Sequence, residues 1–181
     1  MISDIVCEYL VKRKLSPVQI AQAIGMTVLL LLTTWFLRSV GILIDRTGMM
    51  SFLLLCVGLF ATWYFSRFFY MIEYEYTLVN GELTVDRISA KSSRKNLLEV
   101  NVKLFEKFGK YDAETVNKLH AGKVLDYSAD KADENTFFAY YKDEKSNVNT
   151  VLLFTPNQKM LDAMKSSVNA TVYREAFREK K

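Results

Sequence analysis

Two long stretches without charge constrain this chain more than any other feature. Residues 15–37 and residues 47–66 contain no Asp, Glu, Lys or Arg. A bilayer core about 30 Å thick is crossed by about 20 helical residues, so each stretch is long enough to span it once. A helix also satisfies its own backbone polar groups, as the hydrocarbon requires. The sequence therefore predicts two membrane spans, at about 17–38 and 49–70.

The ends of these stretches carry signals for helix boundaries and chain reversal. Ser16, Pro17 and Gln19 fit an N-cap, a first-turn proline and a capping box. The connector 39–48 contains two glycines and charged residues, which favours a reversal. Residues 16–72 are therefore expected to form a two-helix transmembrane hairpin. The alternative is a buried helical hairpin of a soluble protein, although core helices seldom run this long without charge.

The charges beside the first span predict its orientation. Lys12, Arg13 and Lys14 precede it, whereas the turn between the spans has Asp45 against Arg38 and Arg46. Basic flanks stay on the cytoplasmic side, and two spans return the chain to that side. We expect a two-pass protein of the cell membrane with both termini in the cytoplasm. A cleaved signal peptide is the alternative, but its apolar region would exceed the usual length of about 7–15 residues.

Aromatic and basic residues near the span ends are the expected membrane anchors. Trp and Tyr favour the membrane interface, and long cationic side chains reach the headgroups from positions near helix ends. The predicted anchoring set is Lys12, Arg13, Lys14, Trp35, Arg38, Trp63, Tyr64, Arg67 and Tyr70.

The segment before the first span has apolar residues at helical spacing. Ile2, Ile5, Val6 and Tyr9 fall near one face, and a basic cluster follows them. This pattern is typical of an amphipathic helix that lies in the membrane interface. We therefore expect an interfacial helix over residues 1–15.

After residue 72 the period of the pattern changes from helix to strand. Tyr74, Tyr76 and Leu78 alternate with polar residues, and Asn80-Gly81 is the strongest short hairpin signal. The returning strand is expected to contain Leu83, Val85 and Ile88, with a slip near Asp86-Arg87, and further strands are expected over 97–104, 123–128, 136–141 and 149–154. Between them, Asp112 is expected to cap a short helix.

An amphipathic helix is expected after the last strand, with its cap at Thr155. Met160, Leu161, Met164 and Val168 share one helical face there. The predicted class is α+β: a transmembrane hairpin, then a β-rich domain over 73–168. This domain would contain about six or seven antiparallel strands and a closing helix. Residues 169–181 form a charged tail in this interpretation.

The C-terminal pattern resembles a bacterial pleckstrin-homology-like (PH-like) domain. The resemblance is carried by EYEYTLVNGELTVDRISAKSSRK and by LLFTPNQKMLDAMK. The chain is similar to an uncharacterised family of small two-span proteins from Firmicutes-type bacteria. Membership implies a membrane-tethered cytoplasmic module and no established activity. Lipid-binding eukaryotic members use a basic first hairpin loop, which here is only Asn80-Gly81, so phosphoinositide recognition is not implied.

The sequence offers few residues for catalysis. His120 is the only histidine and therefore the only imidazole base for a nucleophile. No glycine-rich phosphate loop occurs, and Asp130, Asp133 and Glu134 lack the spacing of a calcium loop. We expect no enzyme activity, no catalytic residues, no cofactor and no metal site. An enzyme with dispersed carboxylates is the alternative that a single sequence leaves open.

One basic cluster is a candidate binding site. Arg87, Lys91, Arg94 and Lys95 have no acidic residue between them. If their hairpin faced the membrane, each cation would gain about 1 kcal/mol from anionic headgroups. The alternative is an exposed hairpin tip that its charges keep soluble.

These observations favour a non-enzymatic membrane-anchored interaction module that binds a partner protein or the inner leaflet. The alternative is a subunit of an oligomeric pore or transporter, assembled through the small residues Ala21 and Gly25. Against it, the spans contain no charge at mid-depth. Nucleic acid is disfavoured, because residues 73–181 hold 18 basic and 17 acidic side chains. The sequence indicates no small-molecule substrate.

Overall fold

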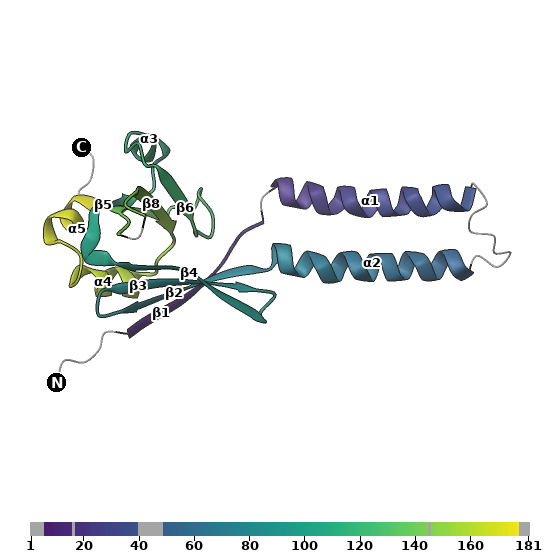
Figure 1. Ribbon diagram of the computed structural model, residues 1–181, viewed down its shortest axis with the longest axis horizontal. Coiled ribbons are helices and arrows are strands. Elements are labelled where there is room, and N and C mark those ends of the chain that lie inside the picture. The colour runs from purple at the N-terminus through teal and green to yellow at the C-terminus, as the bar shows by residue number, and fades with distance from the viewer. Residues whose placement is uncertain (1–5, 16, 40–48, 145, 178–181) are drawn as a thin grey trace. The chain divides into compact units, whose positions relative to one another are not determined.

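A computed structural model describes residues 6–15, 17–39, 49–144 and 146–177 (Figure 1). It divides into two compact units. One unit is Leu15–Ile72, and the other joins Met1–Lys14 to Glu73–Lys181. The second unit therefore draws on sequence from both sides of the apolar helices, and each unit is described separately below.

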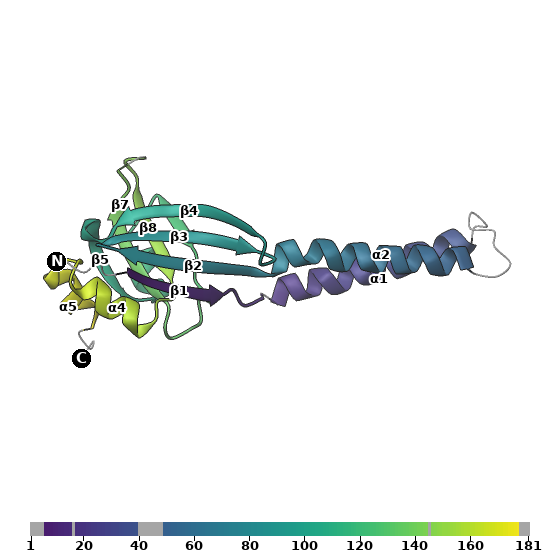
Figure 2. The ribbon, with the colours of Figure 1, turned by 90° about the horizontal axis from the view of Figure 1, so that it is seen from below.

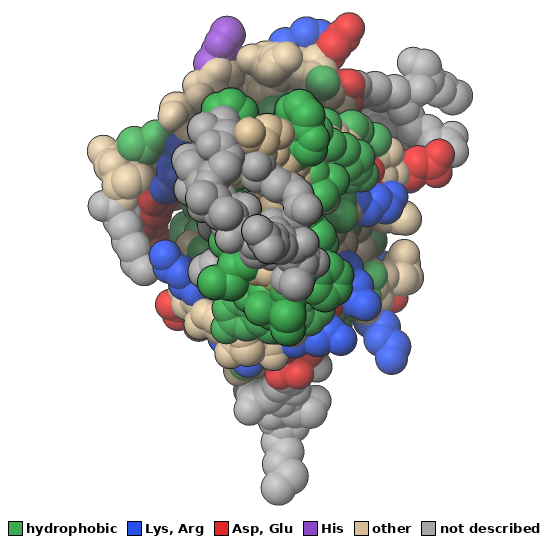
Figure 3. Space-filling view, turned by 90° about the vertical axis from the view of Figure 1, so that its right-hand side faces the viewer, with side chains coloured by type: hydrophobic (Ala, Val, Ile, Leu, Met, Phe, Trp, Pro, Cys, Tyr) green, Lys and Arg blue, Asp and Glu red, His purple; other side chains and the backbone are tan. Residues whose placement is uncertain are grey.

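The first unit contains helices α1 (Pro17–Ser39) and α2 (Met49–Tyr70), which run side by side. Gly58 allows their close approach, because a Cβ there would lie 2.8 Å from Cδ1 of Leu30. Hydrophobic side chains form most of the surface of the helices (Figure 3). Both helices have the predicted extents, whereas Ser16 and residues 40–48 of the connector lie outside the described part of the chain.

The two helices differ in how well they suit a membrane. Within the described residues, Pro17–Leu37 is the one helical segment long and apolar enough to cross a bilayer. The apolar part of α2, Phe52–Tyr64, is shorter. By length and composition alone, the helices therefore support one candidate span, and the second span stays a prediction.

In the second unit, sheet A consists of β1 (Val6–Lys12), β2 (Ile72–Val79), β3 (Glu82–Ser89) and β4 (Ser93–Asn101), in that order (Figure 2). The predicted interfacial helix over 1–15 is wrong, because β1 pairs with β2 from Val6 opposite Val79 to Lys12 opposite Glu73. In so short a segment, apolar residues fit a helical face and a strand alternation equally well. Pairing with β2 makes the segment a strand, and β2 follows both helices in the sequence.

The predicted hairpin at Asn80-Gly81 is confirmed. Both residues have positive φ, 51° and 87°, as a type I′ turn requires. The strands β3 and β4 then pair from Glu82 opposite Asn101 to Ser89 opposite Ser93. Their register shifts between Val85 and Asp86, close to the predicted slip.

Sheet B consists of β5 (Phe105–Lys110), β7 (Phe137–Lys142), β8 (Asn149–Phe154) and β6 (Lys123–Asp126), in that order. A 3-10 turn, Val102–Leu104, leads into β5. Within the described residues, the expected domain contains seven strands, β2 to β8, in agreement with the expected six or seven. Two corrections are needed: β1 adds an eighth strand from before α1, and β6 is parallel to β8 and not antiparallel. The connection from β6 to β8 passes through β7, so β6 and β8 can run in the same direction. The predicted strand over 97–104 ends at Asn101.

The core lies between the two sheets and is rich in aromatic residues. The rings of Tyr76 and Phe154 meet edge to face at 5.9 Å across the sheets. On the other face of sheet B, Val116 of α3 (Ala113–Asn117) packs with Phe138 and Leu153. Asp112 caps α3 by accepting a hydrogen bond from the Thr115 amide, as predicted.

Two helices complete the second unit, α4 (Gln158–Lys165) and α5 (Ala170–Ala176). The cap of α4 is Asn157 and not Thr155, because the Asn157 side chain accepts from the Met160 amide. The sequence left open whether the charged tail is helical, and residues 170–176 of it form α5. Its Tyr173 stacks on Phe108 at 6.3 Å and donates a hydrogen bond to the carbonyl of Leu161.

Candidate functional site

One end of sheet A, where its strands start or stop, brings together most of the predicted binding residues. At this edge β1 ends at Lys12, opposite the start of β2 at Glu73, and the turn between β3 and β4 lies there too. The chain passes to α1 and returns from α2 at the same edge. We call this end of the sheet the linker edge, because the connections to the helices lie there, and define it by residues 12–14, 72–75 and 86–95.

On the outer face of the linker edge, Arg94 is already neutralised. Its guanidinium lies 2.5 Å from Glu75 and 2.7 Å from Asp86, on two neighbouring strands. Asn96 donates a further hydrogen bond to Asp86 at 2.9 Å. The hydrogen bond to Asp86 and the charge of Glu75 raise the pKa of Arg94 above its ordinary value. Arg94 of β4 thus links β2 and β3 through these two ion pairs.

On the inner face of the linker edge, which points toward sheet B, the cations have no carboxylate partner among the described residues. Arg87 on β3 lies directly opposite Lys95 on β4. The Nε atom of Arg87 is buried and has no hydrogen-bond partner. Within the described residues, neither Arg87, Lys91 nor Lys95 forms an ion pair. The predicted four-residue cluster is therefore divided between two faces, with Arg94 apart from Arg87 and Lys95.

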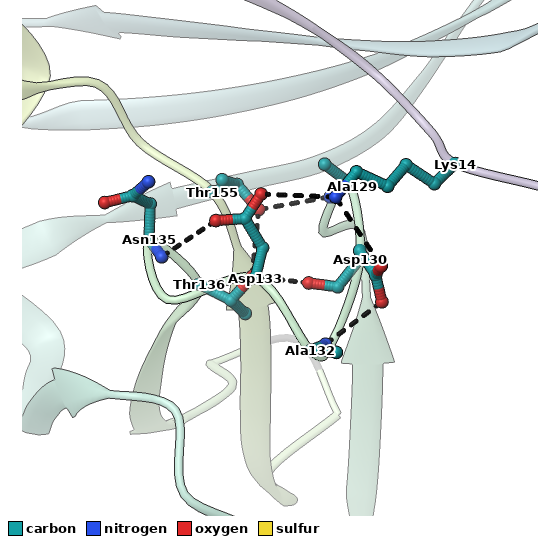
Figure 4. A network of polar contacts seen from close by, with 8 residues as sticks. All are labelled: Lys14, Ala129, Asp130, Ala132, Asp133, Asn135, Thr136 and Thr155. Carbon is teal, nitrogen blue, oxygen red and sulfur yellow. Dashed lines mark hydrogen bonds and ion pairs between the residues drawn. The ribbon is translucent and has the colours of Figure 1, made fainter.

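A polar loop closes one side of the linker edge (Figure 4). The backbone amide of Lys14 donates to the carbonyl of Ala129 at 2.9 Å. The Nζ atom of Lys14 lies 3.7 Å from a carboxylate oxygen of Asp130 and 3.8 Å from one of Asp133. The acidic cluster noted in the sequence thus serves to hold the end of the segment that precedes α1.

Two buried threonines form hydrogen bonds with this loop (Figure 4). Thr155 accepts a hydrogen bond from the Ala129 amide at 3.1 Å, and its hydroxyl lies 3.2 Å from that of Thr136. Thr136 donates to the carbonyl of Asp130 at 2.7 Å. Nearby, Tyr76 donates to the Tyr127 carbonyl and accepts from the Thr155 amide. Burial raises the pKa of Tyr76, so its hydroxyl stays protonated and can keep donating.

The predicted membrane anchors fall into two groups. Lys12, Arg13 and Lys14 belong to the β unit, where Lys12 pairs with Glu73 at 4.0 Å and Arg13 donates to the Tyr74 hydroxyl at 3.4 Å. All three side chains keep substantial exposure. Trp35, Trp63 and Tyr64 are exposed on the helices, as anchors would be. The side chains of Arg38, Arg67 and Tyr70 lie outside the described ones.

The residues considered for catalysis are not assembled into a site. His120 is exposed and has a φ of 45°, so it occupies the left-handed position after α3. The described residues contain no group of three or more His, Cys, Asp or Glu side chains that could hold a metal ion. A groove of about 610 Å³ between β1 and the start of α4 is lined by Lys12, Lys110 and Asn157, among others. It holds no nucleophile and base in hydrogen-bond reach of each other.

Two features of the site were not predicted. The first is the bond from Arg13 to Tyr74, which needs β1 beside β2. The second is the support of the Lys14 segment by the loop at 129–136. The acidic run was visible in the sequence, but its partner lies more than 100 residues away.

Comparison with known proteins supports the PH-like interpretation. The model of one protein family, described as Bacterial PH-like domain (DUF6106), matches residues 3–174. The chain belongs to this family. The match begins before α1, in agreement with a PH-like domain that includes β1. No curated protein and no solved structure matches the chain. The predicted resemblance to bacterial PH-like proteins and the α+β class are thus confirmed, and a PH-like domain suggests a module that interacts with protein or lipid.

Proposed function

We propose that this bacterial PH-like protein is a non-enzymatic interaction module, anchored in the cell membrane by α1 and α2 as a two-pass hairpin. Both termini lie in the cytoplasm, and the linker edge of the β domain contacts the inner leaflet. The observation that carries the proposal is the insertion of both helices between two adjacent strands, β1 and β2. With the helices in a bilayer, such short connections hold the linker edge near the headgroups.

The polar groups of the helices support a lipid environment. Thr27, Thr33, Thr34 and Thr62 each donate their hydroxyl to the carbonyl four residues earlier, at 2.8–3.0 Å. These bonds satisfy the hydroxyls without water, as the hydrocarbon demands. Large apolar side chains, such as Leu29 and Phe60, are exposed over most of their surface. An apolar surface of this kind is stable in lipid and costly in water.

Cysteine labelling in intact cells tests the topology. In a chain with Cys7→Ser and Cys56→Ser, a single cysteine is introduced at Asp45 in the connector or at Glu144 in the β domain. A membrane-impermeant maleimide should label the Asp45→Cys chain from outside, and the Glu144→Cys chain only after permeabilisation. The reverse pattern would overturn the orientation, and recovery of the chain in the soluble fraction would overturn the anchoring.

A second measurement tests whether the linker edge faces the leaflet. A fluorophore is attached in nanodiscs through Lys91→Cys at the linker edge, or through Asn147→Cys in the turn between β7 and β8. The two positions are at opposite ends of the β unit, because Asn149 starts β8 and Phe154 ends it near the Lys14 loop. A quencher on the lipid headgroups should quench the Lys91 position more strongly. Equal quenching at both positions would contradict the proposal.

A further inference from the structure

From the inner face of the linker edge we infer a binding site for a phosphate monoester group, formed by Arg87 and Lys95 with Arg13 nearby. The inference deepens the proposed function and rests on it in part, because it names the chemical group that this edge recognises. It narrows the four-residue basic cluster to Arg87 and Lys95, the two members that lie opposite each other on the inner face.

The first argument is the pairing of two like charges. Arg87 and Lys95 are directly opposite each other on neighbouring strands, so their Cβ atoms are about 5 Å apart on one face. Like charges in this position repel and destabilise a sheet. A bound anion between them would turn this repulsion into two attractions.

The second argument is the unsatisfied donor on Arg87. Its Nε atom is enclosed by protein, yet it has no acceptor. A buried N–H without a partner destabilises the fold, so such groups are uncommon and call for an explanation. The guanidinium presents its donors as a planar fork that matches two oxygens of a phosphate. An oxyanion bound by the guanidinium would give this donor an acceptor once the Arg87 side chain turns toward it, because the Nε atom is enclosed in the unliganded chain.

The third argument is that the nearby carboxylates are already engaged. Glu75 and Asp86 hold Arg94 on the outer face. Asp130 and Asp133 hold Lys14. Among the described residues, no carboxylate lies within ion-pair distance of Arg87 or Lys95.

A third cation favours a doubly charged ligand. The two-residue turn at Asn80-Gly81 sets Val79 opposite Glu82, and counting along the hairpin sets Tyr74 opposite Arg87. Arg13 reaches the hydroxyl of this same Tyr74 at 3.4 Å. Two cations that face each other, with a third that contacts the neighbouring Tyr74, suit a phosphate monoester, which carries up to two negative charges at neutral pH, better than a carboxylate.

Titration with inorganic phosphate tests the site in the full chain, held in neutral maltoside micelles and followed by calorimetry. Replacing Arg87→Gln or Lys95→Gln should weaken binding about tenfold or more, the usual effect of losing a charged hydrogen bond. Arg94→Gln is the matched control, because it removes the same charge one residue away on the opposite face. Its affinity should stay within about twofold of the unmodified chain. Arg87→Lys, which keeps the charge but loses the fork, should be intermediate.

A lipid arm distinguishes a membrane headgroup from a soluble phosphate. The titration is repeated in nanodiscs of phosphatidylcholine alone, with phosphatidic acid, or with phosphatidylglycerol. If phosphatidic acid suppresses phosphate binding and phosphatidylglycerol does not, the ligand is a lipid phosphate monoester. If neither suppresses it, the ligand is a soluble phosphate, and the site is again supported.

Two results would overturn the inference: no phosphate binding in micelles or in phosphatidylcholine discs, or an equal loss in Arg94→Gln and Lys95→Gln. Neither result affects the cysteine labelling, so the site can fail while the proposed topology stands. Conversely, an inverted topology with intact phosphate binding would refute the membrane orientation alone.

Discussion

The two ends of sheet A use similar turns for different purposes. At the far end, Asn80-Gly81 forms a turn from the residues best suited to it, and Gly81 is buried. At the linker edge, Ala90 and Lys91 take the same left-handed conformation with φ of 51° and 58°, which costs non-glycine residues free energy. The far end is packed around Gly81, whereas the linker edge combines strain with the cations Arg87 and Lys95, which form no ion pair among the described residues. With the function proposed above, stability and recognition would be separated along one sheet.

Truncating a buried side chain at each end should give the largest contrast. Leu83 is fully buried beside the far turn, whereas Ile88 is half-buried at the linker edge. Leu83→Ala should lower the free energy of unfolding by about 3 kcal/mol, because it leaves a cavity in the core. Ile88→Ala should cost about 1 kcal/mol or less. Denaturation of the full chain in mild detergent, followed by circular dichroism, measures both.

Equal losses from Leu83→Ala and Ile88→Ala would contradict the contrast. They would mean that the linker edge supports the core as much as the far end does. A loss of phosphate affinity in Leu83→Ala but not in Ile88→Ala would also contradict it, since Leu83 should affect stability only.

The second contrast concerns Gly81. A Cβ at this position would lie 3.1 Å from Cβ of Ser167, and the residue has a φ of 87°. Gly81→Ala should therefore destabilise the fold by about 2 kcal/mol, through left-handed strain and crowding together. Asn80→Ala, at the neighbouring position of the same turn, serves as the comparison with less crowding. If Gly81→Ala unfolds at the same denaturant concentration as the unmodified chain, the tight packing of the far turn is not needed.

The sequence was sufficient for the far end because its signals are local. Asn80-Gly81 and the alternation from Tyr74 to Leu78 each lie within a few residues, and both were predicted correctly. The strand β1 was not, because its alternation is short and its partner β2 follows two long helices. The strand β5 was missed for a related reason: Gly109 and two lysines weaken its pattern, and only pairing with β7 makes it a strand.

The third contrast reverses the sign of the effect. Lys91 is exposed and has a φ of 58°, a conformation that glycine adopts freely. Lys91→Gly should stabilise the fold by about 1 kcal/mol or less, because relief of strain exceeds the extra chain entropy of glycine. The measurement is the same denaturation experiment, with Lys142→Gly in β7 as a control that should destabilise. A loss of stability in Lys91→Gly would show that the turn is not strained.

The candidate site was predictable only as a group of cations. The sequence places Arg87, Lys91, Arg94 and Lys95 together but gives no reason to separate Arg94 from the rest. That separation depends on Glu75, which is brought beside Arg94 by the pairing of three strands. It also depends on the register shift between Val85 and Asp86, where Leu97 is left unpaired on β4, so that Arg94 and Lys95 exchange faces. Neither the pairing across β2 nor the exact shift is encoded by residues near the cluster.

The smallest expected effect is the sharpest test of the two faces. Lys95→Glu places a carboxylate opposite Arg87, so the repulsion of two cations becomes an attraction. Unfolding should require about 0.5 kcal/mol more, the size of a favourable cross-strand pair. Arg94→Glu makes the same change in charge on the outer face, where it would set three carboxylates together with Glu75 and Asp86, and it should destabilise. Both effects should shrink at high salt, because exposed charges are screened. Since the net charge changes equally, opposite signs for the two variants can come only from their local partners. A change of stability in the same direction for both variants would show that Arg87 and Arg94 share one environment. Phosphate binding should be lost in Lys95→Glu, although that variant is expected to be more stable than the unmodified chain.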